Sequence, residues 1–311
     1  MKTVLITGIG GEIAQSVATI IKESRPDIRL VGTDMDIKPH GGSLFVNKVL
    51  QVPNASSEVY LEHMREIIKT YSIDVVIPMT EVELSVFTPL IDELGKNCCI
   101  TSGQSVLAIG LDKLKTMYAL ESLGIQNSWS VKADTDTPFE FPCIFKGQRG
   151  SGSKNVFVVE THEEATFLSR KFPNSIFQEL LEPTDKEVTC TVYRSRDGQI
   201  AVLQLLRKLT DGLTSWAKVI DDHATFVMCK TIAKGLDLNG CMNIQLILTE
   251  NGPRVFEINP RFSSTVLMRH RLGFCDLLWA LDETQGLAVD FPNIAVDQCM
   301  TRVQNVAKLN N

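Results

Sequence analysis

The residues best suited to chemistry lie in the segment EINPR, which begins at Glu257. On a predicted strand over 254–259, the period of two places Val255, Glu257 and Asn259 on one face. The same alternation leaves Phe256 for the core. A carboxylate and an amide side by side offer the oxygen ligands that Mg²⁺ prefers, with places left for water and substrate phosphates. The segment therefore predicts a magnesium site, and a solvated outer face is the alternative.

A third oxygen ligand, Gln245, can join this face under only one pairing register. Gln245 lies opposite Glu257 if the hairpin loop is the three-residue 250–252 with its glycine at positive φ. A two-residue turn at 251–252 would place Gln245 on the opposite face. Pro253 cannot donate to a ladder and is easier to place beside a bulge, so we expect the three-residue loop.

A second candidate begins at Lys146, the last residue of a predicted strand, which is followed by GQRGSGSK. Glycines and serines make a flap whose amides and hydroxyls can close over phosphates, while Lys146 supplies a positive charge beneath it. Because this loop joins strand to strand, it differs from a P-loop. A mobile surface turn is the alternative interpretation.

A third glycine-rich segment, Gly8 to Gly11, follows the first predicted strand and opens a helix, so its amides could hold an anion. A dinucleotide-binding interpretation would use Asp34 for a ribose. However, no tyrosine of the chain has a lysine four residues later, so the acid of a short-chain reductase or epimerase is missing. We favour the alternative, a tight strand-to-helix turn that binds no nucleotide.

Sequence periodicity predicts the elements that position these residues. Up to residue 101 the chain alternates short β-branched runs with helical patterns, which indicates βαβ units and a parallel sheet with ligands at its carboxyl ends. Asp112 is a predicted N-cap, Gly124 a predicted helix end, and Asp197-Gly198 a hairpin signal. The predicted strands cover 3–7, 29–34, 74–78, 98–101, 141–146, 155–159, 176–180, 187–193, 199–207, 241–249 and 254–259, and the predicted helices cover 12–24, 57–71, 83–94, 113–123, 161–171, 222–236 and 265–272.

Composition excludes several classes of protein. A chain of 311 residues is long enough for two or three packed subdomains. Lys plus Arg is 31 and Asp plus Glu is 37, so the net charge of -6 leaves no electrostatic footprint for nucleic acid or an anionic membrane. The 8 cysteines contain no C-x-x-C pair and the 5 histidines no H-x-x-x-H pair, so we expect reduced thiols and no standard zinc site. No apolar run resembles a membrane helix or a secretory signal, which predicts a cytoplasmic protein.

Taken together, the chain resembles the ATP-grasp superfamily, and within it the branch that is similar to the carbamoyl-phosphate synthase large chain and the pyrrolysine-pathway ligase. The motifs that carry the resemblance span nearly all of the sequence: VIPMTEVEL, GLDKLKTMYALESLGI, PCIFKGQRGSGSKNV, FQELLEPTDKEVTCTV and GCMNIQLILTENGPRVFEINPRFSS. The resemblance implies an α/β ATP-grasp fold in three parts. These are an N-terminal parallel-sheet (Rossmann-like) substrate domain over 1–109, a small subdomain with the flap over 110–181 and a large subdomain with the Mg²⁺ site over 182–311.

The resemblance also implies roles for individual residues. Those assigned to ATP are Lys113, Lys146, Gly150, Ser151, Gly152 and Ser153 for the phosphates, Glu179 and Leu181 for the adenine, and Glu187 for the ribose. Those assigned to one or two Mg²⁺ ions are Gln245, Glu257 and Asn259. The catalytic candidates are Arg261, which would clamp the phosphoryl or acyl phosphate, and Arg207, for which a strand-end salt bridge is the alternative. Lys115 is a less favoured rival of Lys113. His270 and Arg271 could face the acceptor, and a buried histidine or a surface pair is the favoured alternative.

The hypothesis for function is an ATP-dependent carboxylate–amine ligase that works through an acyl phosphate, releases ADP and phosphate, and uses ATP and Mg²⁺. Its small-molecule carboxylate and amine would bind at the strand ends of the first domain, near Gly10, Thr80 and Glu81. The alternatives are an ATP-grasp phosphotransferase, an NAD(P)-dependent epimerase or reductase, and a non-catalytic nucleotide sensor. We expect neither nucleic acid nor a membrane as partner, and a homodimer is one possibility.

Overall fold

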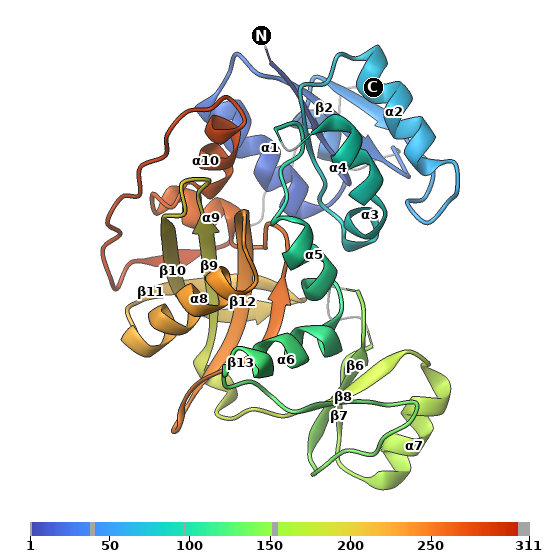
Figure 1. The fold of residues 1–311 in the computed structure, drawn as a ribbon, viewed down its shortest axis with the longest axis vertical. Coiled ribbons are helices and arrows are strands. Elements are labelled where there is room, and N and C mark those ends of the chain that lie inside the picture. Colours follow the sequence, from blue (N-terminus) through green and yellow to red (C-terminus); the bar gives the residue numbers. More distant parts are fainter. Residues whose placement is uncertain (1, 38–40, 96, 151–154, 304–311) are drawn as a thin grey trace.

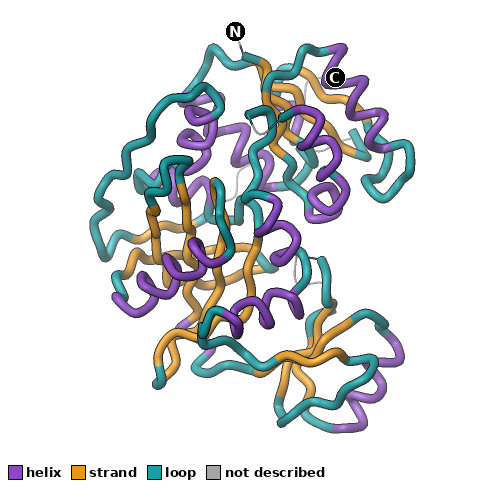
Figure 2. Tube along the Cα trace, viewed as in Figure 1, coloured by secondary structure: helices purple, strands orange, loops and turns teal. Residues whose placement is uncertain are grey.

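The computed structural model describes residues 2–37, 41–95, 97–150 and 155–303. Within them the chain forms three sheets, and helices pack against each (Figure 1). The N-terminal sheet lies at one end of the molecule, the largest sheet in the middle and the smallest at the other end. Figure 2 shows the same three groups of strands with the helices around them. The predicted mixed α/β fold with an N-terminal parallel sheet is confirmed.

The N-terminal sheet is parallel, with strand order β3-β2-β1-β4. Its strands are β1 (Thr3–Ile6), β2 (Arg29–Asp34), β3 (Lys48–Gln51) and β4 (Val75–Ile77), and its helices are α1 (Glu12–Ser24), α2 (Tyr60–Thr70), α3 (Glu81–Val86) and α4 (Thr88–Leu94). Alternation along β1 sends Val4 and Ile6 into a core with α1 and sends Leu5 into a core with α2, α3 and α4. The sheet is therefore covered by helices on both faces, and its carboxyl edge stays open to a ligand.

In this domain one strand was missed and two predictions were wrong in detail. Strand β3 was not predicted, because its four residues are half-exposed at a sheet edge and give only a weak pattern. The predicted strand 98–101 is only a single bridge between Cys99 and Val76. The predicted helix 83–94 is two helices, because Pro89 lies in the first turn of α4 and starts a new helix there.

The smallest sheet is antiparallel, with order β5-β8-β6-β7. Its elements are β5 (Ser130–Lys132), β6 (Cys143–Gly147), β7 (Phe157–Val159), α7 (His162–Lys171) and β8 (Ser175–Glu179). Its core holds Phe145 and Phe177, whose ring centroids lie 5.4 Å apart, against α7. This unit carries the Lys146 end of β6 into the centre of the molecule.

The largest sheet is antiparallel, with order β13-β12-β9-β10-β11-β14. Its strands are β9 (Glu187–Arg194), β10 (Ile200–Thr210), β11 (Leu213–Ile220), β12 (Gly240–Thr249), β13 (Gly252–Asn259) and β14 (Cys299–Thr301). Its helices are α5 (Gln104–Gly110), α6 (Lys113–Ser122) and α8 (His223–Gly235) on one face, and α9 (Val266–Arg271) and α10 (Asp276–Glu283) on the other. Two short 3-10 helices, Gly41–Leu44 and Thr184–Lys186, complete the list.

Strand β11 was missed, although the sequence carries a signal for it. Asp211 and Gly212, which connect β10 to β11, both have positive φ, at 52° and 77°. Thr210 pairs with Leu213, so these two residues form the tight turn that an Asp-Gly pair favours in a hairpin. Strands β5 and β14 and helices α5 and α10 were also not predicted.

Each of the three sheets lies within one of the three predicted segments. Helix α5 crosses the predicted boundary between residues 109 and 110, and α6 falls in 110–181, yet both pack against the largest sheet. The exact boundaries stay predictions. Within the residues that the structure describes, no helix is both long and apolar enough to cross a membrane.

The N-terminal domain is attached to the largest sheet through α1, α9 and α10, which share one apolar core. His270 lies half-buried at this contact, with Nε2 3.4 Å from Ser24 Oγ, and Arg271 pairs with Glu23 on the surface. Both residues therefore contact α1, not the cleft, as the favoured alternative predicts. Behind them the fully buried Arg269 donates to both carboxylate oxygens of Asp276 at 2.9 and 2.6 Å, which joins α9 to α10.

Candidate active site

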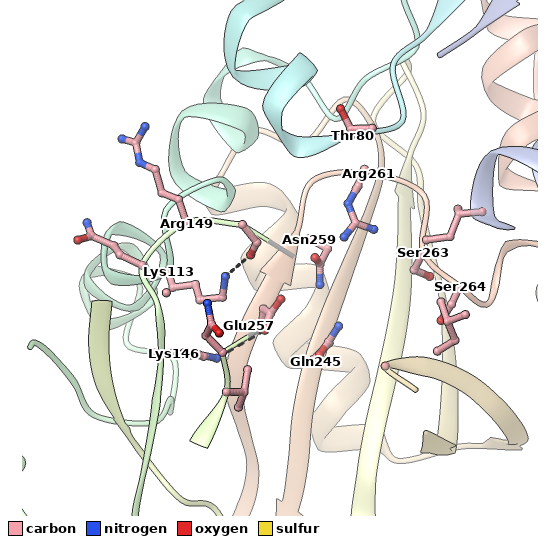
Figure 3. A pocket seen from close by; sticks show the side chains of 18 of the residues that line it. Thr80, Lys113, Lys146, Arg149, Gln245, Glu257, Asn259, Arg261, Ser263 and Ser264 are labelled. Carbon is pink, nitrogen blue, oxygen red and sulfur yellow. Dashed lines mark hydrogen bonds and ion pairs between the residues drawn. The ribbon is translucent and has the colours of Figure 1, made fainter. Parts of the chain in front are cut away.

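A cleft of about 1140 Å³ opens where the three sheets meet. Its walls come from the Gly8 turn and Thr80 of the N-terminal domain, from the end of β6 and the start of α6, and from β12, β13 and the segment after β13. Figure 3 shows Gln245, Glu257 and Asn259 close together in this cleft, with Arg261 next to Asn259 on the side of Thr80. Parts of the three segments that the sequence singled out, the Gly8 turn, the Lys146 end of β6 and the segment from Glu257 to Arg261, thus line one cleft.

A β-bulge brings Gln245 to the side of Glu257. Near the turn Thr249 pairs with Gly252, which leaves Glu250 and Asn251 as the loop, so the predicted three-residue loop is wrong. The register then shifts between Gln245 and Leu246, and beyond the shift Gln245 pairs with Glu257. We expected the loop to contain the one additional residue that brings Gln245 opposite Glu257. In the structure this residue is Phe256, which forms a bulge inside β13.

The same bulge reverses two predictions about side-chain faces. Val255 was predicted to share the face of Glu257, but it is fully buried in the core with α6 and α8. Phe256 was predicted to lie in the core, but it is half-buried, and Lys146 Nζ lies 5.6 Å from the centre of its ring. A bulge adds one residue on one strand, so every residue before it changes faces relative to every residue after it.

The oxygen-rich face formed by Gln245, Glu257 and Asn259 fits Mg²⁺ by the chemistry of its donors. One carboxylate and two amides supply hard oxygens, which suit an ion that completes its shell with water and phosphate oxygens. No group of three or more His, Cys, Asp or Glu that could hold a metal occurs in the described part of the chain, so the amides are needed. Next to them, the Nδ2 atom of Asn243, which pairs with Asn259, is buried without a hydrogen-bond partner among the described residues.

Lys146 and Glu257 form an ion pair across the cleft. Lys146 Nζ lies 3.5 Å from Glu257 Oε2, and the two side chains are 7% and 19% exposed. Burial lowers the pKa of Lys146, Glu257 opposes this shift, and Lys113 adds to it. Burial alone would raise the pKa of Glu257, but the positive charges of Lys146, Lys113, Arg261 and Arg207 together lower it. The site thus keeps Glu257 ionised and concentrates positive charge around it.

This electrostatic arrangement predicts an acid-sensitive contribution to stability. Because the pKa of Glu257 is lower in the folded chain than in the unfolded chain, where it is about 4.3, its contribution is complete above that value and is lost as the pH falls through the folded value. We expect the free energy of unfolding to fall less steeply over this acid range in Glu257→Gln than in the wild type. Urea denaturation of both proteins at a series of pH values measures this. Identical slopes of the free energy of unfolding against pH in the two proteins would contradict an ionised Glu257 paired with Lys146.

The start of α6 and the loop after β6 bind each other. The Asp112 carboxylate accepts from the backbone N–H of Lys115 as the N-cap, and also from Gln148 Nε2 at 2.9 Å to each oxygen. Lys113 Nζ donates to the carbonyl of Gly150 at 2.6 Å, so Lys113 lies at the cleft, whereas Lys115 is exposed and not among the lining residues. Ser151, Gly152 and Ser153 of the predicted flap lie outside the described residues.

Arg207 and Glu187 bind each other. Arg207 Nε and Nη2 donate to Glu187 Oε1 at 3.0 and 2.5 Å, and the side chains are 5% and 19% exposed. Arg207 lines the cleft, whereas Glu187 is not among its lining residues. The alternative considered for Arg207, a strand-end salt bridge, describes this geometry. The ribose role of Glu187 stays a prediction, and its carboxylate already accepts from an arginine.

Glu179 and Leu181, the residues predicted to contact adenine, are not among the residues that line the cleft. The Glu179 carboxylate accepts from Arg254 at 2.5 and 2.7 Å and from the Trp129 N–H at 3.1 Å. The backbone N–H of Glu179 donates to the Trp129 carbonyl at 3.0 Å, so this N–H is already bonded within the protein. Leu181 is 6% exposed.

The N-terminal domain contributes Thr80 and, behind Arg261, Glu81. Thr80 lines the cleft and caps α3 in a reciprocal capping box with Glu83. Arg261 Nη2 donates to Glu81 Oε1 at 3.0 Å, and both side chains are 12% exposed. The guanidinium that the sequence assigned to the phosphoryl group is therefore oriented by a carboxylate from the other domain.

Gly10 does not line the cleft. Its N–H donates to Asp34 Oδ2 at 2.8 Å. Asp34, the carboxylate that a dinucleotide site would use to bind a ribose, thus already accepts a hydrogen bond from one N–H of the glycine turn. This geometry supports the tight-turn interpretation of the segment from Gly8 to Gly11.

Several lining residues were not found from the sequence. Lys171, the last residue of α7, Asn174, just before β8, and Ser263 and Ser264, after β13, line the same cleft. Glu12, in the first turn of α1, lines it from the N-terminal domain. These side chains have no characteristic spacing, because they come from loops and helix ends that only the tertiary fold brings together.

Two family models match the chain. The model described as an ATP-grasp domain matches residues 111–265, and the model described as the PylC-like N-terminal domain matches residues 4–99. A search of curated proteins found no match.

Among solved structures, the N5-carboxyaminoimidazole synthetase of Staphylococcus aureus complexed with ADP is 18% identical with a TM-score of 0.77, over 97% of this chain and 82% of that chain. The biotin carboxylase domain dimer of Hydrogenobacter thermophilus 2-oxoglutarate carboxylase, in complex with MgADP, ADP and bicarbonate, is 14% identical with a TM-score of 0.76, over 96% of this chain and 73% of that chain. The L-amino acid ligase of Bacillus licheniformis is 14% identical with a TM-score of 0.68, over 91% of this chain and 74% of that chain. At these identities the likeness shows the fold. With the two family models matched in order along its length, the chain belongs to the ATP-grasp superfamily.

Proposed function

We propose that the chain is an ATP-dependent carboxylate–amine ligase that forms an acyl phosphate and releases ADP and phosphate. The observation that carries this proposal is the convergence of the oxygen-rich face with Lys113, Lys146 and Arg261 in one cleft. Such a site fits a reaction in which a phosphoryl group is positioned and its charge neutralised, and in which no side-chain nucleophile is needed.

In the proposed reaction, a carboxylate oxygen of the substrate attacks the γ-phosphorus of ATP and ADP leaves. The nitrogen of an amine then attacks the acyl carbon, loses a proton, and inorganic phosphate leaves. Lys113 and Lys146 would hold the phosphates of ATP, and Arg261 would hold the phosphoryl group as it moves to the acceptor. Gln245, Glu257 and Asn259 would hold Mg²⁺, which supplies charge neutralisation of the phosphoryl group when bound.

The solved structures that share this fold support the proposal. One synthetase is described as complexed with ADP, and a biotin carboxylase domain with MgADP and bicarbonate. A third protein of the same fold is a ligase of L-amino acids. From the resemblance to the ATP-grasp superfamily we also propose Glu179 and Leu181 as adenine contacts, Glu187 as a ribose contact and residues 150–153 as the phosphate flap. A homodimer in the cytoplasm is also part of the proposal.

The competing dinucleotide-dependent activity is disfavoured by the bond between Gly10 and Asp34. We therefore expect MgATP, and not NADH, to stabilise the chain. At about 100 times its Kd a ligand raises the free energy of unfolding by about 2.7 kcal/mol, which is readily measured in a melting curve. Stabilisation by NADH with none by MgATP or an unhydrolysable analogue would end the ATP-grasp assignment of the site.

A trapping experiment separates the ligase from a phosphotransferase. With hydroxylamine in place of the amine, a ligase should convert its acyl phosphate to a hydroxamate, with one ADP formed for each hydroxamate. A phosphotransferase should form ADP with the phosphoryl group retained on a stable product. Colorimetric detection of hydroxamate and release of labelled phosphate from [γ-³²P]ATP report the two outcomes. Retention of the label on the product would overturn the ligase.

A further inference from the structure

Arg302, close to the end of the described chain, connects three walls of the cleft. Its Nη1 donates to Glu12 Oε2 at 3.1 Å, its Nη2 to the carbonyl of Ser264 at 2.7 Å and its Nε to the carbonyl of Thr214 at 3.2 Å. Glu12 and Ser264 line the cleft, and Thr214 follows the lining residue Leu213. One guanidinium therefore fixes the first turn of α1, the segment after β13 and the start of β11 relative to one another.

The fold places Arg302 there through β14. This short strand pairs with β11, and the backbone N–H of Arg302 donates to the Ser215 carbonyl at 2.8 Å, which anchors the residue beside the β10–β11 hairpin. The Arg302 side chain is 26% exposed and that of Glu12 is 58% exposed. Arg302 thus holds one carboxylate oxygen of Glu12, a residue that lines the cleft, and leaves much of the Glu12 side chain exposed.

Two other ion pairs of the cleft are built in the same way. Arg261 is held by Glu81, and Arg207 is held by Glu187. In each case one charged group lines the cleft, and its partner is not among the lining residues. In all three pairs, a residue outside the cleft orients a charged residue that lines it. This indicates that the charged groups of the lining have a fixed arrangement.

The signs of these charges describe the molecule that they would bind. The two arginines suit a carboxylate or an acyl phosphate. The other lining carboxylates are engaged elsewhere, since Asp112 caps α6 and Glu257 pairs with Lys146. Glu12 is therefore the lining carboxylate that remains accessible at the N-terminal domain, and it suits a positively charged group of the same substrate.

We propose that Glu12 selects a carboxylate substrate that also carries an ammonium group, and that Arg302 is the positioning residue that orients Glu12. This inference rests on the proposed ligase function and goes further, because it names two residues and the charge of the substrate. The alternative is that Arg302 only attaches the C-terminal segment to the N-terminal domain.

The test uses the hydroxamate assay at saturating MgATP with pairs of acids that differ only by the amino group, such as alanine and propionate or glutamate and glutarate. The wild type should form hydroxamate from an amino acid at least about tenfold more efficiently than from its partner. Glu12→Gln should reduce this preference about tenfold without changing the KM for ATP. Arg302→Ala should raise the KM for the amino acid similarly, Arg302→Lys should restore part of the loss, and the double variant should be no worse than either single one.

A matched control is Arg25→Ala. Arg25 also joins the N-terminal domain to the C-terminal half, through Asp282 at 3.1 and 3.2 Å, but neither residue lines the cleft. This variant should leave the KM for the amino acid unchanged. An equal effect of Arg25→Ala, additive effects of Glu12→Gln and Arg302→Ala, or a parallel rise in the KM for ATP would overturn the positioning role.

The substrate part of the inference fails if the wild type treats both members of each pair alike, or if it binds MgATP but accepts none of the amino acids. That result is distinguishable from failure of the proposed function. In the latter case either MgATP would not stabilise the wild-type chain against heat, or no acid would give a hydroxamate and the labelled phosphoryl group would stay on the product.

Discussion

Replacing Glu257 by glutamine should lower the rate of ADP formation at saturating MgATP by about 10³-fold, while the chain stays folded. Glu257 is the only carboxylate on the oxygen-rich face, so the substitution removes the negative charge that binds Mg²⁺ most strongly and keeps one amide oxygen. It also leaves Lys146, whose side chain is 7% exposed, without its ionic partner. We expect a loss of about 1–3 kcal/mol in the free energy of unfolding, as for a buried group that loses its partner.

The control for this prediction is Glu250→Gln. Glu250 lies at the exposed turn of the same hairpin, so its substitution removes a negative charge without reaching the cleft. Steady-state rates over a range of Mg²⁺ concentrations, together with urea denaturation, separate loss of the metal from loss of the fold. A Glu257→Gln variant with a rate close to that of the wild type would assign these oxygens to a structural face.

Replacing Arg261 by lysine should lower the rate by about 10²- to 10³-fold and should change the KM for ATP much less. Arginines that neutralise a transferring phosphoryl group contribute about 10³- to 10⁵-fold in other phosphoryl-transfer enzymes, and lysine retains the charge but not the planar fork. Lysine is preferred to alanine as the test, because alanine would leave Glu81, 12% exposed, without a cationic partner.

A suitable control is Arg194→Lys. Arg194 pairs with the exposed Asp237 at 2.6 Å, at the far end of β9 and away from the residues that line the cleft. Rapid-quench measurement of acyl phosphate formation locates the defect in Arg261→Lys. An unchanged rate of phosphoryl transfer, or a defect confined to the KM for ATP, would place Arg261 outside the reacting centre.

The sequence by itself determined the features that depend on neighbouring residues. Asp112 caps α6 and Gly124 has a φ of 69° after its end, as predicted from their types and positions. The parallel sheet followed from the alternation of strand and helix patterns. The period of two placed Glu257 and Asn259 on one face as candidate Mg²⁺ ligands, and in the structure Gln245 lies beside them.

The tertiary structure alone decided how these residues meet. The bulge that brings Gln245 to Glu257 lies inside β13, because pairing with β12 and burial of Val255 and Ile258 outweigh the local preference for a longer loop. The charge pairs that orient the site join positions far apart in the chain, as Arg302 joins Glu12 and Arg261 joins Glu81. Such contacts leave no periodic signal in the sequence, since their energy arises only when separate elements pack together. The residue types that gather in the cleft were therefore readable from the sequence, whereas the orientation of each charge depended on the fold.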